Sequence, residues 1–471
     1  MAGTIPQPRT LPPSTPVVMG VVLAGLLAVW LLAPVQAPVE LRVPGKDRPA
    51  GDPAAADTQD VFALGTLVVG SGKPSDLAGS WPRFRGPESD GISRETQPLA
   101  RTWPGSGPRS VWSVEVGEGY AGPVIDRGRV YLMDYDREHQ RDALRCLSLG
   151  DGAEIWRYSY PVSVKRNHGL TRTVPAVTGG KVVAMGPKCH VVVVDAVTGA
   201  FGWGLDLVRD FGTTIPPWYT GQCPLVDGSV VVLAPGGPEA LLMGVELATG
   251  KVLWKTPNPD GWKMTHASVA VMDWNGGRWY LYPASGGVVA VNARDGKLAW
   301  ETADWKINIA TVPTPVVVGD GRVFLTGGYN AGSLLLQFGV KDGVLEAAPL
   351  WRVKANVFGA TQHSPIFHGN HLYGIRADGQ FVCLGLDGRV VWASGAEASF
   401  GLGPLLMADG LILALSDTGR LAAIEVTPSA YRWVAAAQVI EGHEVWAPLA
   451  LAGGRLLARD MTRMICLDVA R

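Results

Sequence analysis

Apolar and polar residues alternate in short runs along most of the chain, and one such run recurs. Its best copy spans residues 245–254, VELATGKVLW, in which two alternating segments flank the turn at Thr249-Gly250. Alternation with a period of two is typical of strands, and glycine takes the positive φ of a tight turn without steric cost. Trp254 has enough area to bury against a neighbouring unit. The pattern predicts a repeat of β-strand units.

The copies are counted most easily by the tryptophan that follows each turn. From Trp156 to Trp433, successive tryptophans stand 41 to 51 residues apart. This spacing is typical of one four-stranded propeller blade. We expect these side chains, with Trp112 upstream, to dock on neighbouring blades. The predicted docking set is Trp112, Trp156, Trp203, Trp254, Trp300, Trp351, Trp392 and a degenerate Trp433.

A second recurring block lies upstream of each tryptophan. It consists of a proline or small residue, apolar residues, a turn with glycine, and further alternating apolar residues, which is a hairpin pattern. Eight blocks predict eight blades. They begin at Gly122, Val174, Cys223, Ser268, Thr314, Ser364, Gly403 and Ala447.

The eighth blade has no outer strand after its third, because the chain ends at Arg471. Residues 110–114, around Trp112, have the outer-strand pattern but no block before them. We expect them to pair beside the strand that contains Cys466, which closes the ring and removes an edge open to aggregation. The predicted fold is all-β, an eight-bladed propeller over residues 110–471.

The N-terminal region has the pattern of a membrane anchor. Residues 17–33 are apolar or small and uncharged, which predicts a signal anchor or transmembrane helix after a cytoplasmic stretch, residues 1–16. We favour an uncleaved segment, because Pro38 directly follows the small residues at the possible cleavage site. The propeller is then expected in the periplasm, anchored in the inner membrane, or secreted if the segment is cleaved.

Two further segments precede the propeller. Residues 34–78 are rich in proline, alanine and glycine, a composition that predicts a flexible linker. Within it, only residues 61–69, VFALGTLVV, have the pattern of an ordered strand or a docking peptide. Residues 79–109 contain WPRFRGPESDGIS from Trp81, and we predict that they form a plug across the face or side of the ring.

Composition excludes several classes of site. The formal net charge is −1, from 41 basic and 42 acidic residues, so there is no electrostatic case for a nucleic-acid partner. Cys146, Cys383 and Cys466 share one strand position, and we interpret them as small buried apolar residues. The chain has no C-x-x-C-H haem motif, paired C-x-x-C zinc motif, G-x-S-x-G motif or P-loop.

Any chemistry is expected around the central channel, where each innermost strand begins. The residues just before the blocks predict a ring of Ala121, Thr173, Gln222, His266, Pro313, His363, Leu402 and Trp446, with Trp218, Tyr219 and Gln362 nearby. This set suits an aromatic or anionic ligand or a metal, but also a solvated funnel of hydrogen-bonding side chains. No residue is assigned a catalytic role, and metal ligands stay open. The ligand-binding candidates are His168, Arg172, Gln222, His266, Asn308, His363, His443, Glu444 and Trp446.

The pattern D/E-x-x-T-G-K-x-x-W, kept at residues 246–254, resembles the docking repeat of pyrroloquinoline quinone (PQQ) type propellers. The resemblance covers about residues 108–470. The leading segment WPRFRGP at residues 81–87, followed by Asp90-Gly91, is similar to the N-terminal signature of PQQ-like proteins of planctomycetes and verrucomicrobia. These motifs are specific for the fold, whereas chemistry on one fold varies.

The resemblance implies two classes of function. Quinoprotein dehydrogenases hold PQQ with calcium over the channel and use an aspartate base, and the alcohol-oxidising branch adds an adjacent cysteine pair. This chain has no adjacent cysteines, since His190 follows Cys189, and we find no convincing calcium ligand set. The other class is the BamB-like scaffold, which is non-catalytic and periplasmic, although this chain lacks its lipobox cysteine.

We therefore predict a membrane-tethered PQQ-like propeller that acts as a non-catalytic binding scaffold without a cofactor. Its partner is expected to be a protein, peptide or polysaccharide, bound at the propeller loops. The alternatives are a PQQ-dependent dehydrogenase with calcium, and a sensor that binds a small ligand or metal at the channel mouth.

Overall fold

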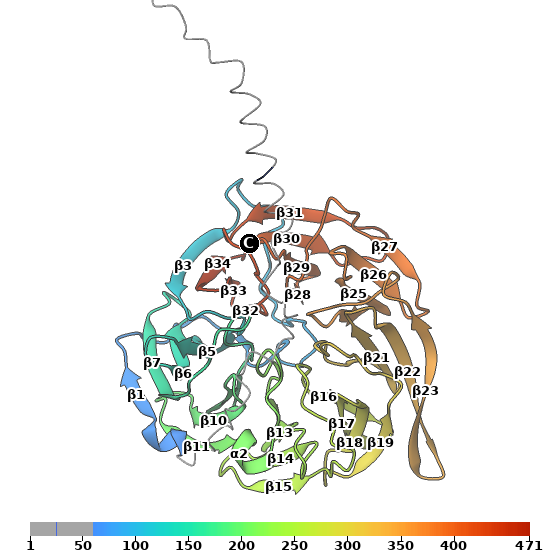
Figure 1. The fold of residues 1–471 in the computed structure, drawn as a ribbon. Helices are drawn as coiled ribbons and strands as arrows, with labels where there is room; N and C mark the ends of the chain where they lie inside the picture. The colour runs from blue at the N-terminus through green and yellow to red at the C-terminus, as the bar shows by residue number, and fades with distance from the viewer. Residues whose placement is uncertain (1–24, 26–59) are drawn as a thin grey trace, which may run out of the picture. The chain divides into compact units, whose positions relative to one another are not determined.

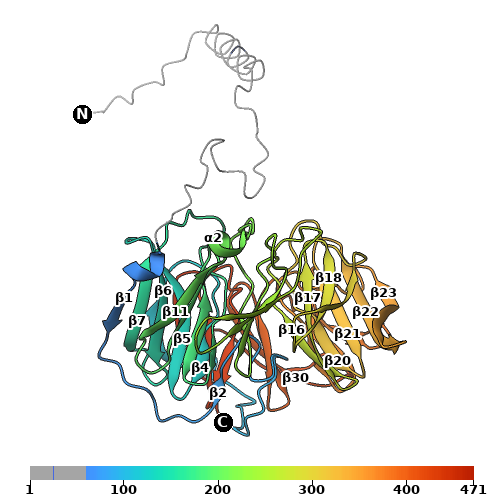
Figure 2. The same ribbon diagram turned by 90° about the horizontal axis from the view of Figure 1, so that it is seen from below.

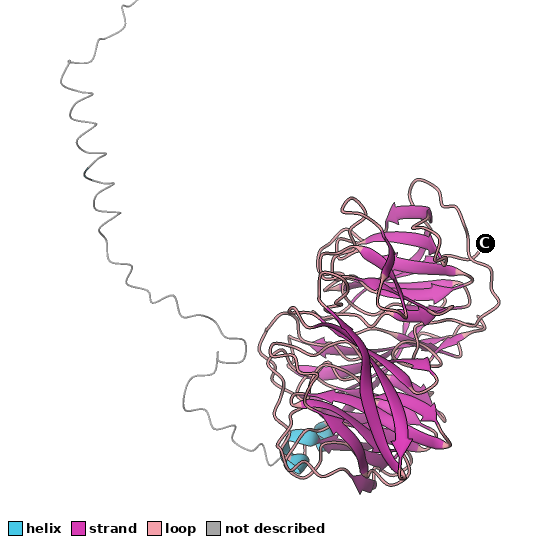
Figure 3. Ribbon diagram, turned by 90° about the vertical axis from the view of Figure 1, so that its right-hand side faces the viewer, coloured by secondary structure: helices cyan, strands magenta, loops and turns pink. Residues whose placement is uncertain are grey.

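The computed structural model describes Gly25 and residues 60–471, and residues 60–471 form an eight-bladed β-propeller around a central channel (Figure 1). The predicted all-β fold with eight propeller blades is confirmed. Helices in this part are limited to η1 (Val61–Leu64) and α2 (Leu207–Phe211), which lie together at one corner of the strand-rich body (Figure 3).

The predicted N-terminal elements cannot be compared with the structure. The cytoplasmic stretch 1–16, the anchor 17–33 and the linker up to residue 59 lie outside the described residues, apart from Gly25. Among the residues that are described, no helix is long and apolar enough to cross a membrane.

Blades 2 to 7 each contain four antiparallel strands, ordered along the chain from channel to rim. Valine, leucine and isoleucine dominate the buried inner strands, as expected for a pleated and packed surface. Blades 2 to 4 contain β8 (Ala176–Thr178), β9 (Lys181–Met185), β10 (His190–Asp195), β11 (Phe201–Asp206), β12 (Leu225–Asp227), β13 (Val230–Leu233), β14 (Met243–Glu246), β15 (Val252–Lys255), β16 (Ala270–Trp274), β17 (Gly277–Ala284), β18 (Gly287–Asn292) and β19 (Leu298–Thr302). Blades 5 to 7 contain β20 (Val316–Gly319), β21 (Arg322–Gly327), β22 (Gly332–Lys341), β23 (Val344–Val353), β24 (Ile366–His368), β25 (His371–Ile375), β26 (Phe381–Gly385), β27 (Val390–Ala393), β28 (Leu405–Ala408), β29 (Leu411–Leu415), β30 (Arg420–Glu425) and β31 (Trp433–Gln438).

Blade 8 is assembled from both ends of the propeller sequence. Its inner strands are β32 (Ala450–Ala452), β33 (Arg455–Arg459) and β34 (Arg463–Asp468), and its outer strand is β3 (Arg109–Glu115). Trp112 lies opposite Cys466 in the β3–β34 register. The predicted closure is confirmed, and it ties the start of the propeller to its end.

Blade 1 is larger than the others. Its own strands are β4 (Val124–Asp126), β5 (Arg129–Asp136), β6 (Arg141–Ser148) and β7 (Glu154–Pro161). The preceding segment adds β1 (Thr66–Val69) outside β7 and β2 (Ser80–Trp81) inside β4. Phe62, just before β1, is buried with its ring centroid 5.1 Å from that of Tyr160. Strand pairing and this burial order the segment, so the flexible linker predicted over 34–78 does not extend to residue 78.

Five rim tryptophans, Trp112, Trp156, Trp203, Trp254 and Trp351, lie against glycine turns of the next blade. Trp392 instead donates its indole N–H to Thr427 O and packs on Tyr431. A Cβ at Gly296 would lie 2.3 Å from Trp254 Cε3, and one at Gly199 would lie 2.7 Å from Trp156 Cδ2. Trp203 Nε1 also donates to Leu247 O at 2.9 Å. A side chain at these turn positions would overlap the indole ring, which explains why each of these turns carries glycine.

The docking role predicted for Trp433 is wrong. Its side chain is 53% exposed. A tryptophan in blade 7 needs the glycine turn between the third and fourth strands of blade 8, and that turn does not exist because β34 and β3 are not consecutive in the chain. Trp300 differs as well, packing edge-on against Phe338 with ring centroids 5.0 Å apart.

A ladder of small polar side chains joins the inner strands of neighbouring blades. In blades 2 to 5, the first residue of the block donates its backbone N–H to the side chain of the equivalent residue in the next blade, beginning with Val174 N to Cys223 Sγ at 3.3 Å. Cys223 N donates to Ser268 Oγ at 3.0 Å, Ser268 N to Thr314 Oγ1 at 3.2 Å, and Thr314 N to Ser364 Oγ at 2.8 Å. Cys223 is therefore part of an inter-blade contact, and all five cysteines are free and buried in the described chain.

Residues 79–101 cross one face of the ring. Figure 2 shows this lower face with β2 and the C-terminus, and the upper face with α2. Arg85 Nη2 donates to Pro365 O of blade 6 at 2.9 Å, and Ser93 N donates to Met407 O of blade 7 at 2.8 Å. We call residues 79–101 the plug segment; it packs across a face of the propeller, as predicted.

Candidate functional site

A cavity of about 410 Å³ opens at the upper end of the channel, and we call it the upper cup. Phe84 of the plug segment lines it together with loop residues from all eight blades. Its polar and aromatic lining residues are Phe84, Tyr120, His168, Arg172, Trp218, His266, Tyr329, Thr361, Gln362 and Trp446. No aspartate or glutamate lines it.

The cup follows a regular position in the repeat. In blades 1 to 6 one lining residue stands two positions before the first residue of its block, and in blades 7 and 8 it stands one position before. In chain order these residues are Tyr120, Arg172, Gly221, His266, Val312, Gln362, Leu402 and Trp446. The predicted ring used the neighbouring position in most blades.

Consecutive residues of an extended chain point to opposite sides, so a shift of one position turns a side chain away from the cup. Gln222 turns into its own blade, where its amide bonds Ala234 N at 2.9 Å and Ala234 O at 3.2 Å. His363 does the same, with Nε2 accepting from Ile375 N at 2.9 Å. The prediction that Gln222 and His363 line the site is therefore wrong.

Three other candidates also lie outside the cup lining. Asn308 and His443 are exposed loop residues that do not reach it. Glu444 acts through another side chain, since its Oε2 accepts from Tyr120 Oη at 2.8 Å. The remaining candidates, His168, Arg172, His266 and Trp446, all line the cup.

One wall of the cup is a stack of flat groups. The rings of Tyr120 and Trp446 are stacked, with centroids 5.0 Å apart and planes inclined by 22°. The Arg172 guanidinium lies over the Tyr120 ring, 5.4 Å from its centroid. In the loops before blades 3 and 4, the Trp218 and His266 ring centroids lie 6.0 Å apart, and the His266 ring rests on Gly221. Flat faces and a cation favour planar, electron-rich groups.

Three buried polar atoms of the cup residues have no hydrogen-bond partner among the described residues. They are Arg172 Nη1, His266 Nε2 and Trp446 Nε1. Leaving such atoms unpaired costs about 1–3 kcal/mol each. A bound group that accepts from the guanidinium and the indole recovers part of that cost.

The charge state of the cup follows from burial. Burial, together with the smaller effect of the nearby Arg172, lowers the pKa of His266 to about 4. Burial also lowers the pKa of Arg172 to about 10, against the opposing effects of Tyr120 and Tyr219. At neutral pH, His266 is therefore neutral and Arg172 is the cation that lines the cup.

The residues present do not fit calcium-bound PQQ. Calcium needs several oxygen ligands, and the cup lining offers no carboxylate. No group of three or more His, Cys, Asp or Glu able to hold a metal occurs in the part of the chain that the structure describes. The nearby carboxylate of Glu444 accepts from Tyr120 Oη, so the cup has no carboxylate free to act as the base that a quinoprotein dehydrogenase uses.

Sequence reasoning missed Tyr120, Tyr329 and Phe84 as lining residues. Tyr120 stands at the same block position as Arg172, so a consistent alignment of the blocks finds it. Phe84 belongs to the plug segment, and Tyr329 to a loop between the second and third strands of blade 5. No local pattern marks either residue as facing the channel.

Comparison with known proteins places the chain among propellers. Its sequence matches the family described as outer membrane protein assembly factor BamB over residues 102–214 and 140–387. It is 25% identical over 226 residues to the outer membrane protein assembly factor BamB of Yersinia pestis, covering 45% of this chain and 51% of that protein. The chain thus spans about half the length of the curated relative that it matches.

Two solved structures share the fold. BamB from Moraxella catarrhalis superposes with a TM-score of 0.54 at 14% identity, covering 76% of this chain and 99% of that one. A europium-containing methanol dehydrogenase superposes with a TM-score of 0.57 at 14% identity, covering 83% and 89%. At such identities the likeness shows the fold alone. The resemblance to planctomycete and verrucomicrobial proteins stays a prediction, because these relatives do not bear on it.

Proposed function

Because the chain belongs to the family described as outer membrane protein assembly factor BamB, we propose that it is a non-catalytic binding scaffold. In this proposal, residues 17–33 anchor it in the inner membrane, and the propeller works in the periplasm. Its partner is a protein, peptide or polysaccharide bound at the propeller loops, and nucleic acid is not a partner.

The observation that carries the proposal is the chemistry of the upper cup. The cup presents a guanidinium, an indole N–H and stacked rings, but no carboxylate to act as a base or to hold a cation. Enzymatic hydride or proton abstraction needs a base placed beside the reacting group. Binding needs only complementary groups on a rigid frame, and Arg172, Tyr120 and Trp446 supply them. This role requires no cofactor.

The alternative is a PQQ-dependent dehydrogenase, and a spectroscopic titration separates the two. Purified full-length protein is titrated with PQQ in the presence and absence of calcium, and oxidation of alcohols and sugars is assayed with a dye acceptor. We expect no saturable change in the PQQ spectrum and no oxidation.

A double variant, His266→Ala with His363→Ala, is expected to keep its circular dichroism spectrum. Calcium-dependent PQQ binding at about micromolar affinity or tighter, abolished by that double variant, contradicts the scaffold proposal. If a small aromatic acid binds without metal, and this binding requires Arg172, the result instead supports the third hypothesis, a sensor that binds its ligand in the cup.

A further inference from the structure

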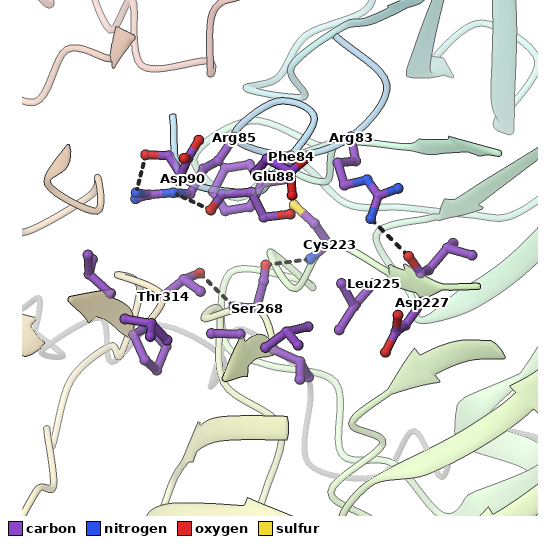
Figure 4. Close-up of a pocket in the computed structure, with 18 of the residues that line it drawn as sticks. Arg83, Phe84, Arg85, Glu88, Asp90, Cys223, Leu225, Asp227, Ser268 and Thr314 are labelled. Carbon is purple, nitrogen blue, oxygen red and sulfur yellow. Dashed lines mark hydrogen bonds between the residues drawn. The ribbon is translucent and has the colours of Figure 1, made fainter. Parts of the chain in front are cut away.

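A second cavity, of about 300 Å³, lies at the lower end of the channel (Figure 4), and we call it the lower cleft. It is bounded by the plug segment on one side and by the innermost strands of blades 3 to 5 on the other. Phe84 and Cys223 line both the lower cleft and the upper cup, so the two cavities meet at these residues. The proposed function uses only the upper cup.

The plug segment shows how this end of the propeller binds an extended chain. Innermost strands are sheet edges, and their outward N–H and C=O groups are open to pairing. β2 pairs with the inner edge of β4 in blade 1. Val177 N of blade 2 donates to Pro82 O at 2.7 Å, and Arg83 Nη1 donates to Val226 O of blade 3 at 2.9 Å. In blade 7, Ile92 forms a parallel bridge with Met407.

The inner edges of blades 4 and 5 are not covered in this way. Val177, Val226, Val271 and Val317 occupy the same position in their blocks. Val177 and Val226, beneath the plug segment, are 4% and 1% exposed. Val271 of β16 and Val317 of β20 are only half-buried, and both line the lower cleft. Because the four valines share one block position, the backbone groups of Val271 and Val317 face the cleft, just as those of Val177 and Val226 face the plug segment.

The charged groups around the lower cleft are mostly occupied by one another. Arg278 binds Asp227 with Nε–Oδ2 at 2.7 Å and Asp273 with Nη1–Oδ2 at 2.6 Å. Arg85 donates to the carbonyl oxygens of Ser89, Asp90 and Pro365. The apolar wall made by Val271, Val317 and Phe367 lines the cleft together with Arg83, whose buried Nε has no hydrogen-bond partner among the described residues.

We propose that the lower cleft binds an extended peptide segment with uncharged, alternately apolar side chains, by adding it as a strand to the inner edges of β16 and β20. The segment belongs to a partner protein. It pairs with innermost strands through its backbone, as the plug segment does on blades 1, 2 and 7. Backbone hydrogen bonds hold the segment, and the valine and phenylalanine wall selects its side chains.

The test uses a fluorescein-labelled peptide, KVTVTVK, and a second peptide with the same side chains and methyl groups on alternate backbone nitrogens. Fluorescence polarisation with the full-length protein is expected to show saturable binding of the first peptide. The methylated peptide is expected to bind about tenfold more weakly or worse, because methylation removes the pairing N–H groups and keeps charge and composition.

Variants locate the site. Val271→Glu and Val317→Glu are each expected to weaken binding about tenfold. Val344→Glu, at an exposed position in β23 far from the cleft lining, is the matched control and leaves binding unchanged. Equal affinity for the two peptides, unchanged affinity in both cleft variants, or no saturable binding overturns the proposal. The methylated peptide keeps the test decisive if a cleft variant fails to fold.

Failure of this inference and failure of the proposed function are distinguishable. Arg172→Gln alters the upper cup and leaves the lower cleft intact, so this variant is expected to bind the peptide like the unmodified protein. Loss of peptide binding in Arg172→Gln places the peptide in the upper cup and contradicts the inference, whatever the PQQ titration shows.

Discussion

The rim and the channel of this propeller are built from the same repeat but differ in how they use it. At the rim, one contact recurs: a tryptophan lies on the glycine turn of the next blade, as Trp254 does on Gly296. At the channel, the equivalent positions carry different residues in every blade, including Tyr120, Arg172 and His266. The recurring contact holds the blades together, and the varied positions are free to form a site.

This difference teaches where to expect an effect of substitution. A rim residue interacts with the neighbouring blade through buried area, so its replacement changes the free energy of unfolding. A cup residue carries polar atoms without a partner, so its replacement removes binding groups at little cost to the fold. The following predictions test this division, from the largest expected effect to the smallest.

The largest effect is expected from deleting residues 79–116, which removes β2, the plug segment and β3. The deletion leaves β34 as an open edge in blade 8 and uncovers the inner edges of blades 1, 2 and 7. Exposed edges template pairing between chains, so we expect loss of the monomer in size-exclusion chromatography. A deletion of 36–59, outside the described residues, is the control and is expected to keep the monomer. Similar behaviour of the two deletions would show that closure by β3 does not hold the ring.

A smaller effect is expected at single rim tryptophans. Trp254→Ala is expected to cost about 3–5 kcal/mol of unfolding free energy, as other large-to-small changes in packed regions do. Trp433→Ala, at the 53% exposed position, is expected to change it by less than about 0.5 kcal/mol. Chemical denaturation measures both. Equal losses would show that docking on a glycine turn is not what stabilises the rim. Trp300→Ala is expected to lower the unfolding free energy by about as much as Trp254→Ala, because Trp300 packs on Phe338.

The smallest effect per residue is expected from two histidines, His266 of the cup and His363 within blade 6, and it depends on pH. The pKa values of His266 and His363 are lowered to about 4, chiefly by burial, from an ordinary value of 6.5. As the pH falls, these two histidines therefore become protonated near pH 6.5 in the unfolded chain but only near pH 4 in the folded chain. Stability is full above pH 6.5 and falls as pH decreases to about 4, by about 1–3 kcal/mol for each histidine.

His266→Gln with His363→Gln is expected to flatten this decline in melting temperature between pH 7 and pH 4. His368→Gln, at the exposed end of β24 in blade 6, serves as the control and is expected to leave the decline unchanged. An identical decline in all three proteins would place the acid-sensitive groups outside the channel.

Much of the architecture was predictable from the sequence alone. Eight blocks and their tryptophans indicated eight blades, and residues 110–114 were correctly placed beside the strand that contains Cys466, although the two segments are far apart in the chain. Strand alternation and glycine turns are local properties, so the order of residues within one repeat determines them. Residues 61–69 were also recognisable as a segment able to dock.

The site depended on the tertiary structure, for physical reasons that single residues show. His363 and Gln222 stand one position from the lining residues of their blades, and a shift of one residue reverses the direction of a side chain. Phe84 lines the channel only because the plug segment crosses the lower face, and Trp433 lost its docking turn only because blade 8 closes with a strand from the other end. The sequence by itself determined the repeat, because each repeat is local; which side chains meet at the channel was decided by how eight blades close around it.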